Sequence, residues 1–302
     1  MHCGASPAGP EGESATAPAP APAPAPFRTQ LLKWVGNKQR FAHEIIAALP
    51  EDMGTYHEPF LGAGGVMATL QPRRAVGSDV FAPLIEIWQT LSADPARLKR
   101  WYAQRWHFCQ QGDRVARYEQ IRASYNARPN GADLLFLCRA CYGGVVRFRK
   151  SDGHMSTPCG AHRPISPQAF ARRVDIWHRR MRGVRFERMD YREAMARAAP
   201  GDVIYCDPPY SDSQTILYGA QDFNLQELFA AIAQCKARGV RVALSIDGSK
   251  KSGDVRCAID IPEGLFEREL AVNVGRSMLR RFQMGGQTLE REEVRDRLLL
   301  SY

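Results

Sequence analysis

The chain has 302 residues, of which 44% are hydrophobic and 24% are charged, and its formal net charge at neutral pH is +9. This length and apolar content suffice for one large α/β domain with an inserted module, or for two small domains. No apolar run reaches the roughly 18 residues that cross a bilayer, and no Lys/Arg-flanked apolar stretch marks the start, so we expect a cytoplasmic protein. The eight scattered cysteines are typical of reduced thiols rather than of a disulfide framework.

The first 27 residues consist largely of proline and alanine, with an Ala-Pro alternation over 17–26. Such a segment favours extended, solvated backbone and has little apolar surface to bury, so we expect residues 1–27 to be disordered. Ordered structure should begin near Phe27, and the apolar spacing predicts a helix over 39–49 that stops at Pro50.

The segment between these two regions carries an aromatic ring and a basic group close to a glycine, at Trp34, Gly36 and Lys38. We interpret it as the edge of a ligand site, where Lys38 meets a carboxylate and Trp34 covers a ring or an aliphatic chain. The alternative is a core tryptophan beside a surface lysine, and these residues alone leave both interpretations open.

A glycine-rich turn over 61–65 follows a short predicted strand and opens a predicted helix. Phe60, Gly62 and Gly64 belong to this region, where glycines let the backbone approach a ligand closely. A bare G-x-G also occurs in many ordinary turns, so the interpretation needs a second signal. That signal is Asp79, which ends the next predicted strand 17 residues after Gly62.

An acidic residue at the end of this second strand can accept hydrogen bonds from both hydroxyls of a ribose. Nothing upstream resembles a phosphate-binding loop, which favours an adenosyl group without phosphates over a dinucleotide. S-adenosylmethionine fits that description, and we expect it as the cofactor. We expect no metal, because Cys138 and Cys141 have no second cysteine pair at zinc spacing.

Residues 95–189 form a basic and mainly helical segment, with one break over 142–164 that is rich in Gly, Arg and Pro. Residues 95–190 hold 20 Lys/Arg against 7 Asp/Glu, whereas the rest of the chain holds 21 against 25. A basic segment within a mildly acidic frame indicates a polyanionic partner, and we expect it to bind nucleic acid. The alternative is a solvated basic surface.

A β-branched and aromatic run over 203–206 ends in Asp207, Pro208, Pro209 and Tyr210. Prolines cannot continue a central strand and they restrict the residue before them, so the chain must leave the sheet in a stiff corner. Open α/β sheets bind ligands at this carboxyl edge. Here the Asp207 carboxylate and the Pro208 carbonyl can accept the N–H groups of an exocyclic amine, while Tyr210 stacks on the base. The alternative is an ordinary Pro-Pro turn with a surface tyrosine.

The rest of the chain predicts a helix over 224–238 and a strand over 240–246. Over 265–302 we expect further strands, with a short helix near 290–296.

Strands and helices thus alternate on both sides of the basic segment, which predicts an α/β fold with a mostly parallel twisted sheet and helices on both faces. This catalytic domain would comprise residues 28–94 and 190–302. The inserted domain over 95–189 would be mainly helical and carry a β-hairpin.

The chain resembles the Dam-type (D12 class) DNA adenine N6-methyltransferases. The Lys-Trp-Val-Gly-Asn-Lys stretch, the glycine turn, the basic insertion and Asp-Pro-Pro-Tyr occur in that family's order, over about residues 30–302. The resemblance implies the S-adenosylmethionine-dependent methyltransferase fold, S-adenosylmethionine as methyl donor, and adenine N6 in double-stranded DNA as acceptor. The target base would be flipped out of the duplex. We expect a monomer that binds no membrane.

The resemblance also implies residue roles. It assigns cofactor contacts to Trp34, Gly36, Lys38, Phe60, Gly62, Gly64, Asp79, Asp190, Tyr191 and Asp207. It assigns the reaction to Asp207, Pro208, Pro209 and Tyr210. It implies DNA contacts at Arg139, Tyr142, Arg147, Arg149, Lys150 and Arg163. Arginine suits the two major-groove acceptors of guanine and also binds phosphate, and both roles stay open for each arginine.

The chain departs from the family mainly in the DNA-reading stretch. Cys138 and Gly143 stand where the family usually has Asn, and Ser156-Thr157-Pro158-Cys159-Gly160 replaces Asn-Val-Pro-Phe-Gly. Ser245-Ile246-Asp247 departs from the customary Ser-Asn. The resemblance therefore does not extend to a GATC target, while the catalytic motif is intact.

Two other functions stay open. The first keeps the chemistry but changes the acceptor to cytosine N4, an RNA adenine or a protein amide. Related cytosine enzymes favour Ser, and glutamine modifiers favour Asn, at the position of Asp207, which favours adenine here. The second is a DNA-binding regulator without catalysis, against which the intact Trp34, Gly62 and Asp79 argue.

Overall fold

The computed structural model describes residues 27–209, 223–247, 249–250, 255–256, 259–275 and 294–302. The predicted tail up to residue 26, the Tyr210 ring and the loop predicted over 211–222 lie outside these residues. Phe27 is buried, and its ring centroid lies 5.4 Å from that of Trp177. The core therefore begins where order was expected to start.

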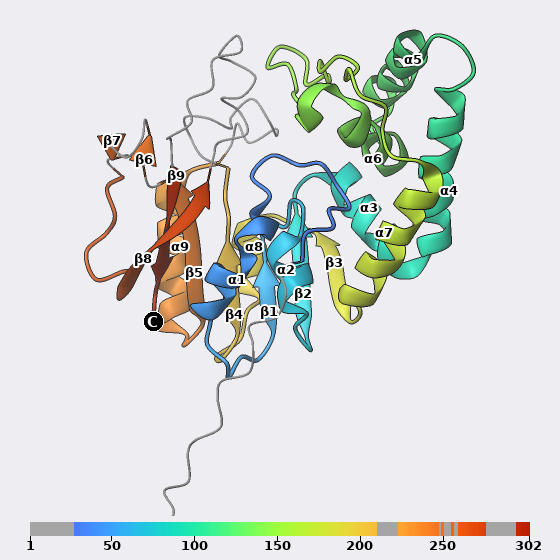
Figure 1. Cartoon of the computed structure of the whole chain (residues 1–302). Coiled ribbons are helices and arrows are strands. Elements are labelled where there is room, and N and C mark those ends of the chain that lie inside the picture. Colours follow the sequence, from blue (N-terminus) through green and yellow to red (C-terminus); the bar gives the residue numbers. More distant parts are fainter. Residues whose placement is uncertain (1–26, 210–222, 248, 251–254, 257–258, 276–293) are drawn as a thin grey trace, which may run out of the picture.

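A seven-stranded sheet crosses the molecule in the order β3-β2-β1-β4-β5-β9-β8 (Figure 1). Its strands are β1 (Tyr56–Glu58), β2 (Ala75–Asp79), β3 (Val184–Arg188), β4 (Val203–Cys206), β5 (Arg241–Asp247), β8 (Arg268–Gly275) and β9 (Val294–Leu300). Strands β1 to β5 run parallel, while β9 is antiparallel to both β5 and β8. A separate pair is formed by β6 (Ser249–Lys250) and β7 (Val255–Arg256). The mostly parallel α/β sheet predicted from the sequence is confirmed.

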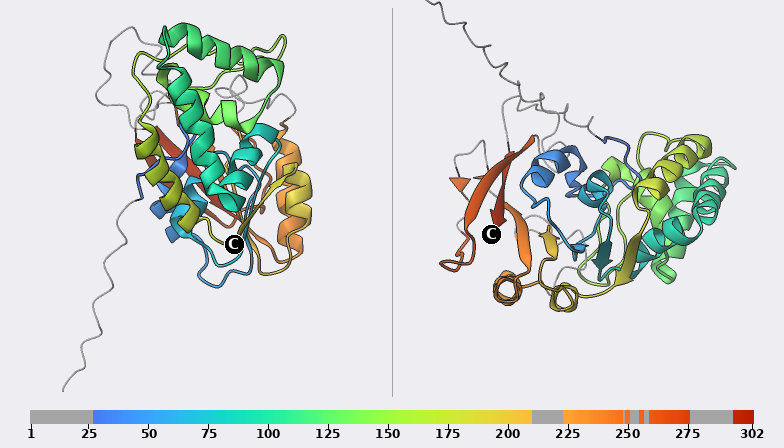
Figure 2. Two further views of the ribbon diagram at one scale, coloured as in Figure 1. Left: turned by 90° about the vertical axis from the view of Figure 1, so that its right-hand side faces the viewer. Right: turned by 90° about the horizontal axis from the view of Figure 1, so that it is seen from below.

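Helices cover both faces of the sheet, as the view from below shows (Figure 2). One face carries α1 (Ala42–Ala47), α2 (Gly65–Leu70) and α3 (Ala82–Ala93), and the other carries α8 (Tyr191–Ala196) and α9 (Leu225–Ala237). Side chains alternate between the faces along each strand, so Val203 and Tyr205 pack on the first face while Ile204 and Cys206 pack on the second. This burial on both faces explains why the strand before Asp207 is continuously apolar.

Four helices gather beside the β3 edge of the sheet and form a lobe, coloured from teal through green to yellow-green in Figure 1. They are α4 (Pro95–Phe108), α5 (Arg114–Ala127), α6 (Gly131–Ala140) and α7 (Pro167–Arg180). Each begins after a side chain that accepts a hydrogen bond from the backbone N–H three residues further on, at Asp94, Asp113, Asn130 and Ser166. These caps satisfy N–H groups that have no partner within the helix, and they fix where each helix starts.

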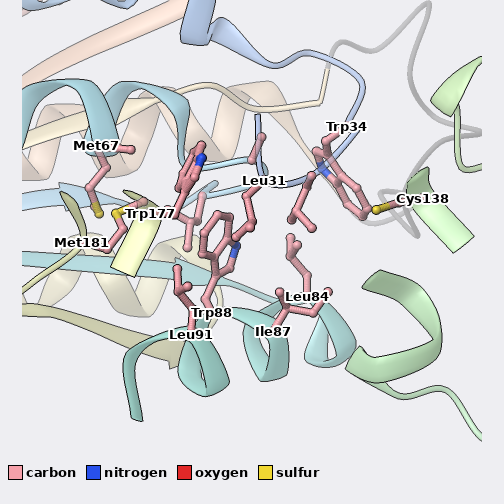
Figure 3. Packing of buried hydrophobic residues seen from close by; sticks show 14 of the residues in the cluster. Leu31, Trp34, Met67, Leu84, Ile87, Trp88, Leu91, Cys138, Trp177 and Met181 are labelled. Atoms are coloured by element: carbon pink, nitrogen blue, oxygen red, sulfur yellow. The ribbon is translucent and has the colours of Figure 1, made fainter. Parts of the chain in front are cut away.

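The lobe and the sheet share one hydrophobic core (Figure 3). Trp88 of α3 lies between them, with its ring centroid 5.5 Å from Trp177 of α7 and 5.8 Å from Phe186 of β3. Leu31 and Trp34 of the N-terminal segment are buried in the same cluster. Because this core is continuous, the inserted segment is anchored to the sheet rather than joined to it by a linker.

One strand of the sheet lies within the segment that the sequence predicted to be mainly helical. β3 falls inside the predicted insertion over 95–189, yet it pairs with β2 in register from Val184 opposite Ala75 to Arg188 opposite Asp79. Val184 and Phe186 are buried, whereas the residues between and after them are more exposed. This period-two burial is the pattern of an edge strand, so the insertion ends before residue 184 rather than at 189.

The C-terminal end also differs from expectation. The helix predicted near 290–296 is wrong for residues 294–296, because these begin β9; residues 290–293 lie outside the described part of the chain. The strand inserts between β5 and β8, where Leu298, Leu299 and Leu300 are all buried. A position inside the sheet, with neighbours on both sides, outweighs the local helical pattern.

The helix predicted over 39–49 is shorter and interrupted. It forms a 3₁₀ turn, η1 (Lys38–Arg40), followed by α1. The Asn37 side chain accepts a hydrogen bond from the Gln39 N–H and so sets the start of η1. This places Lys38 at the edge of the sheet.

Candidate active site

A cavity of about 420 Å³ lies at the carboxyl edge of the parallel sheet, where β1, β2 and β4 end. Every residue predicted to contact the cofactor lines it: Trp34, Gly36, Lys38, Phe60, Gly62, Gly64, Asp79, Asp190, Tyr191 and Asp207. Pro209 lines it too, next to Pro208 in the corner that follows β4. Tyr210 lies outside the described residues. The structure thus brings together motifs that lie far apart in the sequence.

The glycine turn borders the cavity, and two of its glycines have a backbone conformation that other residues rarely adopt. Gly62 and Gly64 have φ angles of 47° and 59°, in the left-handed region. A Cβ on Gly64 would also lie 2.8 Å from the Met181 Cε. The Gly62 N–H donates to the Asp79 Oδ2 over 3.2 Å, which ties the turn to the end of β2.

Asp79 is held by backbone donors and still faces the cavity. Its Oδ1 accepts from the Phe81 N–H at 3.0 Å, and its Oδ2 accepts from Gly62. Burial raises the pKa of Asp79 to about 6, although these backbone N–H groups oppose the shift. Because a carboxylate has about four acceptor sites, the two bonds leave capacity for hydroxyl donors.

Aromatic rings form one wall of the cavity. Phe60 stacks on Tyr191 with ring centroids 5.1 Å apart, and Phe223 meets each of them edge-on at 5.9 Å. Asp190 caps α8 by accepting from the Arg192 N–H, and it also pairs with the Arg192 guanidinium. The sequence did not single out Phe223, because no motif surrounds it. Such a wall suits a planar ring.

Lys38 reaches across the cavity to the proline corner. Its Nζ lies 2.8 Å from the Asp207 Oδ1 and 3.5 Å from the Asp296 Oδ2 of β9, and all three side chains are largely buried. Burial by itself lowers the pKa of Lys38. The Asp207 and Asp296 carboxylates together raise this pKa by more than burial lowers it, so the net shift is upward. The ammonium is therefore charged and directed to Asp207, whereas the sequence led us to expect a ligand carboxylate as its partner.

Glu58 is a further acidic residue that the sequence analysis did not single out. It ends β1, is buried, and accepts a hydrogen bond from the Tyr56 hydroxyl over 2.8 Å. Burial raises the pKa of Glu58 to about 8, so it is mostly protonated at neutral pH. Its place at the end of a short predicted strand, directly before the glycine turn, was a signal that could have identified it.

Between α6 and α7 the chain doubles back over residues 141–160, which we call the recognition hairpin. Two isolated bridges close it, Cys141 opposite Cys159 and Phe148 opposite Met155. The buried Thr157 hydroxyl donates to the Val145 carbonyl at 2.8 Å and accepts from a backbone N–H of the facing arm at 2.9 Å. Backbone hydrogen bonds also join the arms, from the Tyr142 N–H to the Pro158 carbonyl and from the Ser156 N–H to the Arg147 carbonyl, and Thr157 adds a side-chain link between them.

The residues predicted to contact DNA fall into two groups. Five of them are exposed on or beside the recognition hairpin: Tyr142, Arg147, Arg149, Lys150 and Arg163. Tyr142 and Arg147 line a second cavity of about 110 Å³. The Arg149 guanidinium pairs with Asp152 within the hairpin.

Arg139 is placed differently from the other five. It is half-buried, and its guanidinium donates to the carbonyls of Gln30 and Leu31 at 3.2 and 2.7 Å. It also lies over the Phe170 ring, 5.8 Å from the centroid. Arg139 therefore fixes the N-terminal segment onto the lobe, and we leave it out of the proposed DNA contacts.

Within the described ranges, no three His, Cys, Asp or Glu side chains gather in a group that could hold a metal ion. In the same part of the chain, no helix combines the length and apolarity needed to cross a membrane.

Known proteins resemble this chain over most of its length. The model of the D12 class N6 adenine-specific DNA methyltransferases matches residues 34–269. A DNA adenine methylase of Vibrio cholerae is 30% identical over 227 residues, which cover 71% of this chain and 79% of that protein. A DNA adenine methylase of Serratia marcescens is 30% identical over 185 residues, or 60% of this chain and 66% of that protein. A DNA N-6-adenine-methyltransferase of Escherichia phage P1 is 26% identical over 234 residues, which cover 74% of this chain and 30% of that protein.

Proposed function

The chain belongs to the D12 class of N6 adenine-specific DNA methyltransferases, and from that premise we propose that it moves the methyl group of S-adenosylmethionine to adenine N6 of double-stranded DNA. The target base would be flipped into the cavity at the sheet edge, because N6 cannot be reached inside a duplex. The observation that carries the proposal is the buried Asp207 carboxylate, displayed at the cavity wall beside the aromatic and acidic groups of a nucleoside site.

The half of the cavity around Asp79 fits the cofactor. The Asp79 carboxylate has acceptor capacity left for ribose hydroxyls, and the rings of Phe60, Tyr191 and Phe223 offer flat faces for an adenine. A volume of about 420 Å³ lies in the range of small-molecule sites. S-adenosylmethionine, when bound there, supplies a methyl group on a sulfonium, and this chain's residues need only orient the acceptor toward it.

The half around Asp207 fits the acceptor amine. An exocyclic amine shares its lone pair with the ring and is a weak nucleophile, so an acceptor that takes one N–H and sets its direction favours attack. Lys38 keeps Asp207 in place, and the two prolines after it stiffen the corner. Positioning of this kind can lower a barrier by about 7–11 kcal/mol. The Pro208 carbonyl as second acceptor and the Tyr210 ring as stacking partner stay predictions.

The recognition hairpin supplies the proposed DNA contacts. Its exposed Arg147, Arg149 and Lys150, with Arg163 beside it, can meet phosphates and base edges, while Tyr142 offers an aromatic face. Extruding the target base costs a few kcal/mol, which such contacts must offset.

The proposal is tested by expressing the chain in a methylation-free host and mapping N6-methyladenine across the genome. In vitro, transfer of labelled methyl to duplex DNA is compared with transfer to single-stranded DNA and to RNA. The Asp207→Asn variant should lose transfer while it still binds sinefungin, a cofactor analogue. The matched control, Asp260→Asn, changes an exposed carboxylate and should behave as the wild type.

Label that appears on cytosine or on RNA would replace the adenine of duplex DNA as the acceptor. If the wild type bound DNA and cofactor but methylated no polynucleotide, the chain would be a binding protein and the proposal would be wrong.

A further inference from the structure

The strand β9 brings a carboxylate to the reaction site from the far end of the chain. Because β9 runs antiparallel to β5, its first residues lie beside the carboxyl end of β5, and Asp296 is opposite Asp247 in the register. Leu298 and Leu300, at alternate positions after Asp296, are buried in the core cluster that contains Tyr205. Asp296 therefore lies on the same face of β9 as Leu298 and Leu300, at the end of the strand nearest the cavity. Only 6% of Asp296 is exposed.

At this edge one ammonium serves two carboxylates. The Lys38 Nζ lies 2.8 Å from Asp207 and 3.5 Å from Asp296, so the first contact is a short hydrogen bond and the second is longer. An ammonium has three donors, which lets it contact both groups at once. A buried charge without a partner is costly, so both carboxylates depend on the Lys38 ammonium and the ammonium depends on them.

The arrangement matters because Asp207 must serve a second donor. The target amine needs an Asp207 oxygen as acceptor, and the Lys38 ammonium already occupies Oδ1. If Asp207 were the only anion near Lys38, admitting the amine would leave a buried ammonium uncompensated. Asp296 offers that ammonium a second anionic partner within a short movement.

We propose that Asp296 is a positioning residue, which shares the Lys38 ammonium with Asp207 and receives it when the target amine binds Asp207. The inference rests on the proposed function, since it concerns the same amine. Among the described residues, the neighbouring Tyr205 hydroxyl does not take this role. The Tyr205 hydroxyl is bonded to the Ser245 hydroxyl at 2.9 Å, and burial, followed by the charge of Asp207, raises the pKa of Tyr205 well above its usual value.

The first test compares Asp296→Asn with Glu269→Gln in the full chain. The control removes the exposed Glu269 carboxylate of β8, which pairs with Arg297 of β9. Because hydrogen bonds to charged groups contribute about 1.5–3 kcal/mol, Asp296→Asn should lower kcat about 10- to 100-fold. The KM for DNA should stay within about twofold, since phosphate and base contacts lie elsewhere. Asp296→Glu should recover part of kcat.

The second test asks whether Asp296 acts through Lys38. In a Lys38→Met background, Asp296→Asn should have almost no further effect on kcat, because the ammonium that it holds is gone. Losses that multiply would show that Asp296 acts independently, and would overturn the inference. The same would follow if Asp296→Asn kept wild-type kcat.

A third measurement uses the wild type, and so stands even if Asp296→Asn does not fold. Lysine side chains are labelled with ¹⁵N, and the Lys38 resonance is assigned by its loss in Lys38→Arg. It should shift when duplex DNA is added together with sinefungin, and shift less with DNA in which purine replaces the target adenine, since purine lacks the amine. An equal shift with both DNAs would overturn the inference while methyl transfer by the wild type remained intact. If the wild type transferred no methyl group, the proposed function would fail first, and this inference with it.

Discussion

The charged side chains of the sheet edge and of the recognition hairpin differ in their exposure to solvent. At the edge, Lys38, Asp207 and Asp296 are largely buried, and the Lys38 ammonium pairs with both carboxylates. On the hairpin, Arg147, Arg149 and Lys150 are exposed. A transfer reaction gains from groups that are fixed before the substrate arrives, whereas reading DNA needs long side chains that can adjust to a surface. If the proposed roles are right, substitutions on the hairpin should change the DNA target without loss of the chemistry at the edge.

Most departures from the family lie in or beside the recognition hairpin, whereas Ser245-Ile246-Asp247 lies on β5 at the sheet edge. Two of those near the hairpin have a structural reason of their own. Cys138, where Asn is usual, is fully buried, and its thiol contacts the Leu135 carbonyl at 3.3 Å. Gly143, also in place of Asn, has a φ of 65°, in a region that Asn tolerates better than most residues. Neither change therefore requires a different DNA target, which leaves residues 156–160 as the departure most relevant to sequence preference.

The largest effect should come from breaking the buried ion pair at the edge. Lys38→Met leaves the Asp207 and Asp296 carboxylates without the ammonium that both contact, so Asp207 loses the group that orients it. Breaking a buried pair costs about 3–5 kcal/mol, so kcat should fall at least about 100-fold at neutral pH. Steady-state methylation measures this, with sinefungin binding as the control. A fall of less than threefold would mean that the edge does not depend on fixed charge.

The next effect concerns the pH dependence of stability. The folded-state pKa of Glu58, about 8, lies above its usual value of 4.5, so the native state binds an extra proton between these two pH values. Stability from this group is full below about pH 4.5 and is lost as pH rises toward 8. Glu58→Gln removes this titration, so only the wild type should lose stability between pH 5 and pH 8. The Tm of the variant should therefore rise relative to that of the wild type, by an amount that corresponds to a few kcal/mol of unfolding free energy. A constant Tm difference would show that Glu58 is ionised throughout.

A smaller effect should come from the recognition hairpin, where Thr157 fixes the backbone geometry and no buried charge is involved. Thr157→Val removes the hydroxyl that joins the Val145 carbonyl to the Arg147 N–H, and leaving such groups unpaired costs about 1–3 kcal/mol. DNA affinity should fall while sinefungin binding stays unchanged, as measured by titration of each ligand. Thr157→Ser keeps the hydroxyl and should retain most of the affinity. An equal loss in both variants would point to the methyl group instead.

The smallest effect should come from an exposed hairpin arginine. Arg149 already pairs with Asp152, and exposed ion pairs contribute about 0–1 kcal/mol, so the net loss of DNA affinity in Arg149→Ala should be modest. A phosphate contact predicts the same loss on every sequence and a salt dependence reduced by about one charge. A loss confined to the methylated site would assign base reading to Arg149. Binding assays at several salt concentrations separate the two.

The sequence predicted the parallel part of the sheet well, because its strands carry strong local signals. β4 was placed at its observed ends by an apolar run that stops at two prolines, and β5 and α9 fell within a residue or two of their predicted limits. β3 was missed because its exposed charged residues match the basic helices around it. β9 was taken in part for a helix because its place between two strands leaves little trace in its own composition.

Local patterns could identify Asp79 and Asp207, since strand ends and prolines place these side chains at the carboxyl edge whatever the remaining chain does. No local pattern could identify the partners of Lys38. Asp207 is 169 residues away from it, and Asp296 is further still on an antiparallel strand. Folding of the chain brought these charged groups together. A buried ammonium needs a carboxylate partner, and the tertiary structure decides which carboxylates lie near it. Short sequence motifs thus determined which reactive groups lie at the sheet edge. The ion pairs of those groups were decided by contacts between elements that are distant in the sequence.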